Sequence, residues 1–110
     1  MVFDDEVVFQ AQIEILADDR VHVVVSGSVD LWSESQFSEV LDAAAALRPG
    51  ALVVDLRGVD FLSASSLRHL IRVRDVARGR GLDFVVHSPP AGIVRWLLAQ
   101  YVILPAHADH

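Results

Sequence analysis

The chain has 110 residues, a length that suits one compact domain, and 53% of them are apolar. It contains no Cys, which excludes disulfides, thiolate metal sites and Cys nucleophiles. Its formal net charge of −6 argues against general nucleic-acid binding, because contacts with phosphates need a positive face.

The first ten residues, MVFDDEVVFQ, are acidic, whereas a signal peptide begins with basic residues. No apolar run in the sequence approaches the ~20 residues that a membrane-spanning helix requires. We therefore expect a cytoplasmic protein without a membrane span.

Two strands that form a hairpin are predicted near the start of the chain. In VVFQAQIEI (7–15) apolar residues occupy the odd positions, which is the period of a half-buried strand. LADDR then indicates a turn, and VHVVVSG (21–27) a second strand that runs antiparallel to the first.

A helix followed by a central strand is predicted next. Ser33 and Gln36 fit the S-x-x-Q capping box, and Trp32 and Phe37 occupy the positions of a hydrophobic staple. The segment RPG ends this helix. ALVVDL (51–56) is almost continuously apolar, which indicates a central strand that is covered on both faces.

The second half of the chain alternates between helices and strands. A helix is predicted from about residue 64 to 78, where GRG follows and ends it, and LDFVVH (82–87) is a strand. SPP (88–90) suits the start of a third helix, AGIVRWLLAQY (91–101).

This order predicts a single α/β domain over 1–110, with a mixed, mostly parallel sheet of four or five strands packed with three or four helices. The core is expected over about 7–104. Residues 105–110 are expected to form a frayed tail.

The charges are unevenly distributed along the chain. Residues 1–42 contain ten acidic residues and one basic residue, whereas residues 68–80 contain five arginines and one acid. This asymmetry has two interpretations. The charges either form an ordinary solvated surface or create an electric field that steers a charged partner.

The serine-rich segment VDFLSASSLRHLI holds the main candidates for chemistry. A catalytic site would need Ser63, Ser65 or Ser66 with a histidine and an acid, but the chain lacks the G-x-S-x-G elbow. The pair His107 and His110 does not match a ligand spacing such as H-E-x-x-H, and no glycine-rich phosphate motif opens a helix. We therefore predict no catalytic residues, no metal and no cofactor.

Ser63 precedes the predicted second helix, where its hydroxyl can cap the first free N–H groups. The same helix start tolerates an added anion, because it carries unpaired N–H groups and a partial positive charge. A phosphate on a serine there would change the surface by nearly two charges and expel a partner bound to it. The serines are thus either helix caps or a phosphorylation switch.

Three segments together resemble a STAS domain, the fold shared by anti-sigma factor antagonists and the cytoplasmic tails of sulfate transporters. VVVSGSVDL (23–31) is similar to the family's strand that ends in Gly-Glu-hydrophobic-Asp. ALVVDLRGVDFLSASSLRHLI (51–71) is similar to the central strand, loop and switch helix, and GLDFVVHSPPAGIVRWLL (81–98) to the last strand, turn and helix. The resemblance covers roughly residues 7–104.

In the antagonists, the switch loop usually reads Asp-Ser-Ser/Thr-Gly-Leu after two apolar residues. Here Ser63 replaces the Asp, and Ala64 replaces the serine that is normally phosphorylated. Ser65 keeps the next Ser/Thr, and Ser66 replaces the Gly. The resemblance therefore implies phosphorylation at Ser65 or Ser63, or no phosphorylation at all.

The resemblance implies a non-enzymatic bacterial signalling protein, an anti-sigma factor antagonist that regulates transcription by partner switching. It would bind an anti-sigma factor, commonly a serine kinase of the histidine-kinase ATPase type, and so release a sigma factor. The implied contact surface includes the loops at 27–32 and 57–65 and the start of the second helix. Its candidate residues are Asp30, Gly58, Asp60, Ser63, Ala64, Ser65 and Ser66. Asp30 is equally well explained as a loop cap before the first helix.

Two other functions stay open. Ala64 has no hydroxyl, which suits a constitutive scaffold or sensing module that binds other STAS proteins, or a second copy of itself, without phosphorylation. The third alternative is a version of the fold that binds a small ligand or a lipid.

Overall fold

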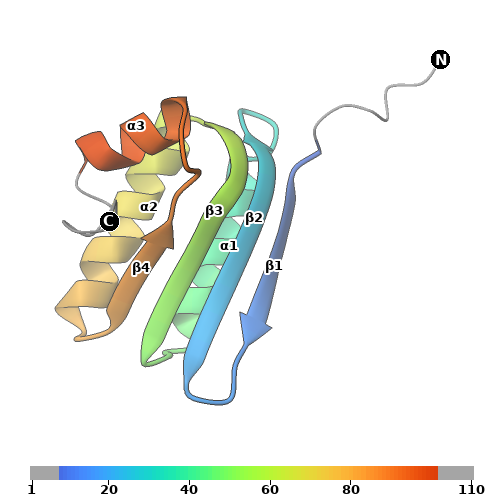
Figure 1. Ribbon diagram of the computed structural model, residues 1–110. Helices are drawn as coiled ribbons and strands as arrows, with labels where there is room; N and C mark the ends of the chain where they lie inside the picture. Colours follow the sequence, from blue (N-terminus) through green and yellow to red (C-terminus); the bar gives the residue numbers. More distant parts are fainter. Residues whose placement is uncertain (1–7, 102–110) are drawn as a thin grey trace.

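The seven elements of the fold follow one another in the order β-β-α-β-α-β-α (Figure 1). A computed structural model describes residues 8–101. The strands are β1 (Gln10–Ile15), β2 (Arg20–Val29), β3 (Ala51–Leu62) and β4 (Asp83–His87), and the helices are α1 (Glu34–Ala46), α2 (Ala64–Gly79) and α3 (Ile93–Gln100). The start of the predicted first strand at residue 7 and the predicted frayed tail lie outside the described residues.

The four strands form one sheet in the order β1-β2-β3-β4. β1 pairs antiparallel with β2, whereas β2, β3 and β4 are parallel to one another. The predicted hairpin and the predicted mixed, mostly parallel sheet are therefore confirmed. β1 also alternates as its sequence predicts, because Ala11 and Ile13 pack against the core while Gln10, Gln12 and Glu14 are exposed.

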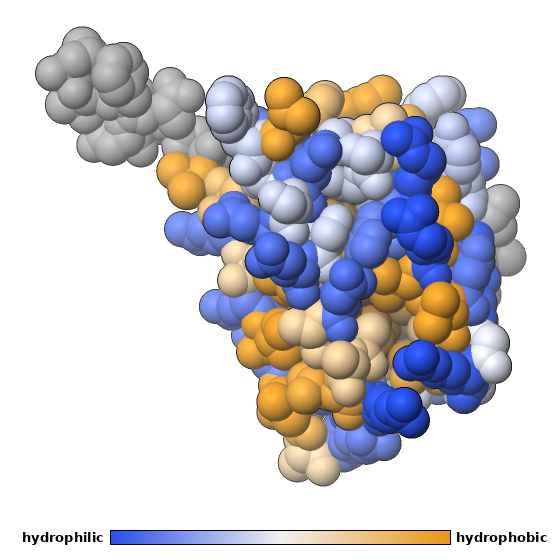
Figure 2. All heavy atoms as spheres, turned by 180° about the vertical axis from the view of Figure 1, so that it is seen from behind, coloured by the Kyte–Doolittle hydropathy of each residue, from blue (hydrophilic) through white to orange (hydrophobic). Residues whose placement is uncertain are grey.

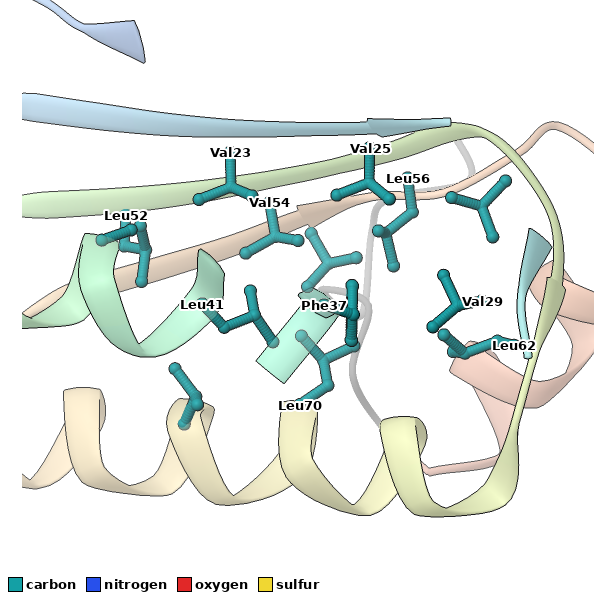
Figure 3. Close-up of a cluster of buried hydrophobic side chains, with 14 of the residues drawn as sticks. Val23, Val25, Val29, Phe37, Leu41, Leu52, Val54, Leu56, Leu62 and Leu70 are labelled. Carbon is teal, nitrogen blue, oxygen red and sulfur yellow. The ribbon is translucent and has the colours of Figure 1, made fainter. Parts of the chain in front are cut away.

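The hydrophobic core lies between the sheet and the helices α1 and α2, which cover the same face of the sheet (Figure 1). Successive side chains of a strand point to opposite faces, so every second residue of β2 and β3 turns toward these helices. The side chains that meet there include Val23, Val25, Leu52, Val54 and Leu56 from the strands and Phe37, Leu41 and Leu70 from the helices (Figure 3). This packing fixes the positions at which α1 and α2 begin.

β3 continues beyond the predicted end of the strand at Leu56 and reaches Leu62. Most of the segment predicted as the loop 57–65 is therefore strand. Val24 pairs with Asp55 but Ser26 pairs with Gly58, so β3 carries one extra residue between these pairs, and a second register shift follows further along. Such bulges bend a strand and allow it to continue through a segment that breaks the apolar pattern.

Two glycines make the close contacts at this end of the sheet. Gly27 has a φ of 94°, and a Cβ atom there would lie 2.5 Å from the carbonyl oxygen of Val8. A Cβ atom at Gly58 would lie 3.0 Å from the Cβ of Ser26 on the neighbouring strand. The absence of a side chain thus permits the backbone approach at both positions.

The predicted capping box at the start of α1 is wrong. Ser33 has helical backbone angles and makes no side-chain cap, and its hydroxyl instead donates to the carbonyl oxygen of Ser28 over 2.8 Å. Trp32 is 87% exposed while Phe37 is buried, so the predicted staple between them does not form either.

The predicted start of α3 at the segment SPP is also wrong. The Ser88 hydroxyl donates to the carbonyl oxygen of Pro89 and does not cap a helix. The helix begins only at Ile93, after Gly92, which has a φ of 95°. α3 then buries Val94 and Leu98 in the core.

Candidate functional site

The candidate contact residues gather where β2 and β3 end and where α1 and α2 begin. In parallel β-α-β units, the carboxyl ends of the strands and the starts of the following helices share one edge of the sheet, where functional groups tend to lie. The backbone N–H of Ser63 donates to the carbonyl oxygen of Val29 over 2.8 Å and so connects the start of α2 to the end of β2.

Ser63 caps α2, as the sequence predicts. Its backbone is extended, and its Oγ accepts a hydrogen bond from the backbone N–H of Ser66 over 3.2 Å. The two hydroxyl oxygens of Ser63 and Ser66 also lie 2.9 Å apart. Ser66 is only 1% exposed, so its side chain does not lie on the surface where the sequence had placed it.

Glu34 joins the starts of the two helices, and sequence reasoning missed it. Its Oε2 accepts hydrogen bonds from the hydroxyls of Ser63, over 2.9 Å, and Ser65, over 2.7 Å. Glu34 is the first residue of α1, and the starts of both helices carry partial positive charge that favours a carboxylate. The site therefore holds an acid next to Ser63 and Ser65.

Ala64 and Ser65 form the exposed first turn of α2. Ser65 donates its hydroxyl to Glu34 and takes no part in the cap. Ala64 presents a methyl group to solvent. Ser65 is thus the most exposed hydroxyl of the three serines in this segment.

Asp30 organises the turn between β2 and α1. Its Oδ1 accepts from the backbone N–H of Trp32 over 3.0 Å and from the hydroxyl of Ser33 over 3.1 Å. Its carbonyl oxygen accepts from the backbone N–H of Glu34 over 2.9 Å. These bonds support the loop-cap interpretation of Asp30, and they place Glu34 beside the serines.

Asp60 lies at the second register shift of β3, between the pairs Gly27 with Val59 and Ser28 with Phe61. Its Oδ1 accepts from the Ser28 hydroxyl over 2.7 Å, which joins the ends of β2 and β3. The carboxylate is exposed at the same edge as Ser65.

Asp55 and Arg57 form an ion pair at the first register shift of β3. Two guanidinium nitrogens of Arg57 lie 3.0 and 2.8 Å from the Asp55 carboxylate, and the backbone N–H of Arg57 donates to it over 3.0 Å. The hydrogen bond from the Arg57 side chain holds the pKa of Asp55 below its ordinary value of 3.8. This pair stabilises the bend and leaves Gly58 to pair with Ser26.

The histidine nearest to the serines in sequence has other partners. His69 Nε2 lies 2.8 Å from Asp42 of α1, and its Nδ1 lies 3.4 Å from Arg72. Within residues 8–101, no group of three or more His, Asp or Glu side chains is placed to hold a metal ion. His107 and His110 lie outside these residues. No helix in the described part of the chain combines the length and hydropathy needed to cross a bilayer.

Solved structures of other proteins share the fold described above. The chain is similar to the crystal structure of an anti-sigma factor antagonist from Mycobacterium paratuberculosis, with 26% identity and a TM-score of 0.76 over 93% of this chain and 90% of that one. The structure of the anti-sigma factor antagonist SpoIIAA in its unphosphorylated form shares the fold, with a TM-score of 0.64 and 12% identity over 86% of this chain and 82% of that one.

A comparison with functionally curated proteins yields no match. The family model described as "Mlab, STAS domain" matches residues 15–102, which is most of the chain and includes all the candidate contact residues. This match confirms the resemblance inferred from the three sequence segments. The chain therefore belongs to the STAS domain family described by that model.

Proposed function

We propose that the protein is an anti-sigma factor antagonist, which binds an anti-sigma factor and thereby releases a sigma factor for transcription. The observation that carries the proposal is the likeness, over 93% of the chain, to a solved anti-sigma factor antagonist. The protein acts by binding rather than by catalysis, and its partner is an anti-sigma factor of the serine kinase type with a histidine-kinase ATPase domain.

The proposed contact region is the serine surface, which we define as Asp30, Glu34, Asp60, Ala64 and Ser65. Large apolar side chains are exposed in the segments that flank it: Leu31 is 76%, Trp32 87% and Phe61 48% exposed. Aromatic anchors of this kind supply much of the binding energy in protein interfaces, and Trp and Tyr are enriched among them. The combination supports a protein partner.

Ser65 is the proposed phosphorylation site. The Ser63 hydroxyl caps α2 and is half-buried, so its modification would remove the cap. Ser65 is exposed and makes its side-chain hydrogen bond only to Glu34 within the described residues. A phosphate on Ser65 would therefore leave the cap of α2 intact.

The same phosphate would change the serine surface. It would break the hydrogen bond from Ser65 to Glu34 and set nearly two negative charges against that carboxylate. At a separation of about 4 Å, the repulsion between two unit charges is about 1 kcal/mol in bulk water and about 4 kcal/mol at the effective dielectric constant near a protein surface. Glu34 would turn away from α2, and a partner fitted to the unmodified surface would be released.

A constitutive scaffold or sensing module is the second candidate function. It is favoured by Ala64, which is exposed at the family's phosphorylation position and offers no hydroxyl. In this case the protein would bind other STAS proteins, or a second copy of itself, and would carry no phosphate in cells.

Affinity capture of the tagged protein from its native cells, followed by mass spectrometry, identifies the partner and any phosphate on Ser65.

The affinity of that partner is then measured for Ser65→Ala, Ser65→Glu and Ala43→Glu. Ala43 is exposed near the far end of α1, so Ala43→Glu adds the same charge away from the serine surface. We expect a loss of at least tenfold only for Ser65→Glu. Recovery of STAS proteins without an anti-sigma factor would favour the scaffold, and equal affinities of all three variants would refute the switch.

A further inference from the structure

A groove lies between the carboxyl-terminal halves of α1 and α2, and its lining differs from the serine surface in polarity and charge. It has a volume of about 450 Å³, and its floor is apolar. The floor includes Ala45 of α1, Val73, Val76 and Ala77 of α2, and Leu82. Figure 2 views the molecule from the side of these helices and shows apolar surface bordered by strongly hydrophilic side chains.

Three arginines surround this floor. Arg48, Arg72 and Arg80 line the groove, and all three are exposed. Asp42 is the only carboxylate among the lining residues, and it is bonded to His69 over 2.8 Å. Three arginines and one Asp leave two positive charges in excess, although the whole chain carries a net charge of −6.

Two of these arginines are available for a ligand. Within residues 8–101, neither Arg48 nor Arg80 forms an ion pair or a side-chain hydrogen bond. Both also line a second hollow, of about 380 Å³, on the side of Pro49 and Gly81. An anionic group between them can therefore be reached from the apolar groove and from solvent.

The ends of the two helices would ordinarily repel an anion, because free carbonyl groups give a helix end partial negative charge. Here the last carbonyls accept backbone hydrogen bonds. The Ala77 oxygen accepts from Arg80 and Leu82, and the Ala45 oxygen accepts from Arg48. These bonds satisfy the carbonyl groups, and Arg48 and Arg80 add positive charge beside them.

The size and the charge pattern restrict the occupant. A volume of about 450 Å³ falls in the range of about 300–1,000 Å³ typical of small-molecule sites. Beyond the bridge between His69 and Asp42, the space between the helices is lined by Glu34 and Glu39. These acids oppose a long acidic peptide that would follow the whole groove, and so they favour a small ligand held at the arginine end.

We propose that this groove binds an anionic amphiphile, a molecule with an aliphatic chain and one carboxylate or phosphate head group. The head group lies between Arg48 and Arg80, whose planar guanidinium groups match both anions. The chain lies over Val73 and Val76 and ends near His69. The site is separate from the serine surface and does not depend on the function proposed above.

The test is isothermal titration calorimetry of the full chain with decanoate and with decyl phosphate, below the concentrations at which they form micelles. Decanol serves as the uncharged control. The variant R48Q/R80Q removes the head-group site, and R68Q/R78Q removes two exposed arginines of α2 outside the groove and is the control for net charge. Val76→Glu places a carboxylate on the floor, and circular dichroism verifies that each variant is folded.

We expect saturable binding of at least one of the two anions, at least tenfold weaker binding of decanol, and at least a tenfold loss for R48Q/R80Q and for Val76→Glu. Amide shifts in NMR spectra should map to Ala45, Val73 and Val76. Binding of decanoate alone identifies a carboxylate ligand, and binding of decyl phosphate alone a phosphate ligand. No saturable binding, an equal loss in R68Q/R78Q, or shifts confined to α3 would overturn the proposal.

Discussion

At the scale of single residues, Ser63 and Ser65 have different tasks although they are two positions apart. Ser63 Oγ accepts the backbone N–H of Ser66, whereas Ser65 makes one exposed hydrogen bond to Glu34. We predict that Ser63→Ala lowers the free energy of unfolding by about 1 kcal/mol, the usual cost of a lost helix cap. Ser65→Ala should change it by less than about 0.5 kcal/mol, as is typical of surface positions. Urea denaturation of both variants measures this, and equal losses would contradict the assignment of the cap.

The sequence predicted the cap at Ser63 because one local pattern governs it. It could not reveal Glu34, because the bonds to Ser63 and Ser65 join residues about 30 positions apart and depend on how α1 docks beside α2. The capping box at Ser33 was wrong for a local reason. Asp30 lies three residues earlier, and its backbone N–H donates to the Ser33 hydroxyl oxygen over 3.0 Å, so this oxygen serves the turn before α1 and not the helix itself.

At the scale of elements, the hydrophobic patterns predicted the order of the strands and helices, and the structure confirms it. The end of β3 was missed because the segment RGVD lacks the apolar pattern by which a strand is recognised. Two register shifts against β2 keep this segment in the sheet, and sequence period alone does not indicate them. The start of α3 was placed too early, because Ser and Pro are common at helix starts and also in turns.

The ion pair at the first of these register shifts makes the stability of the fold depend on pH. The Arg57 side chain bonds the Asp55 carboxylate and lowers its pKa below 3.8. A lowered pKa in the folded state stabilises the fold above pH 3.8, and this stabilisation is lost as the pH falls through the pKa of folded Asp55. We predict that Arg57→Gln raises the pKa of Asp55, measured by NMR titration of its carboxyl carbon. The deficit in stability of this variant should shrink below pH 3.8.

The control for this prediction is Arg68→Gln, which removes an exposed arginine from α2. It should leave the Asp55 titration unchanged, because Asp55 has its hydrogen bonds from Arg57. If Asp55 titrates at the same pH in the wild type and in Arg57→Gln, the pair does not control the charge at this bend.

At the scale of the whole molecule, the fold turns the uneven distribution of charge along the chain into two surfaces. Asp30, Glu34 and Asp60 lie at the edge where α1 and α2 begin, and Arg48 and Arg80 lie where these helices end. The two clusters therefore carry opposite charges, although Asp19 and Asp83, whose backbones bond Gly50, lie at the same end as Arg48 and Arg80. A partner of the serine surface should present a basic face, whereas a ligand of the arginine groove should be an anion.

This polarity predicts how the proposed anti-sigma factor associates. Attraction between oppositely charged surfaces accelerates encounter and is screened beyond about 10 Å at 0.1 M salt. We expect the association rate constant to fall roughly tenfold between low salt and about 0.5 M salt, while the dissociation rate changes little. Stopped-flow fluorescence of Trp32, which is 87% exposed beside the serine surface, is a suitable probe.

Two variants separate steering at the serine surface from a general charge effect. Glu39→Gln removes an exposed carboxylate from α1 near Ser65, and Asp83→Asn removes one at the opposite edge of the sheet. Both reduce the net charge equally, but only Glu39→Gln should slow association and flatten its salt dependence. Equal effects of the two variants would mean that net charge alone governs the encounter. An association rate that does not depend on salt would mean that Leu31, Trp32 and Phe61 bind the partner without electrostatic guidance.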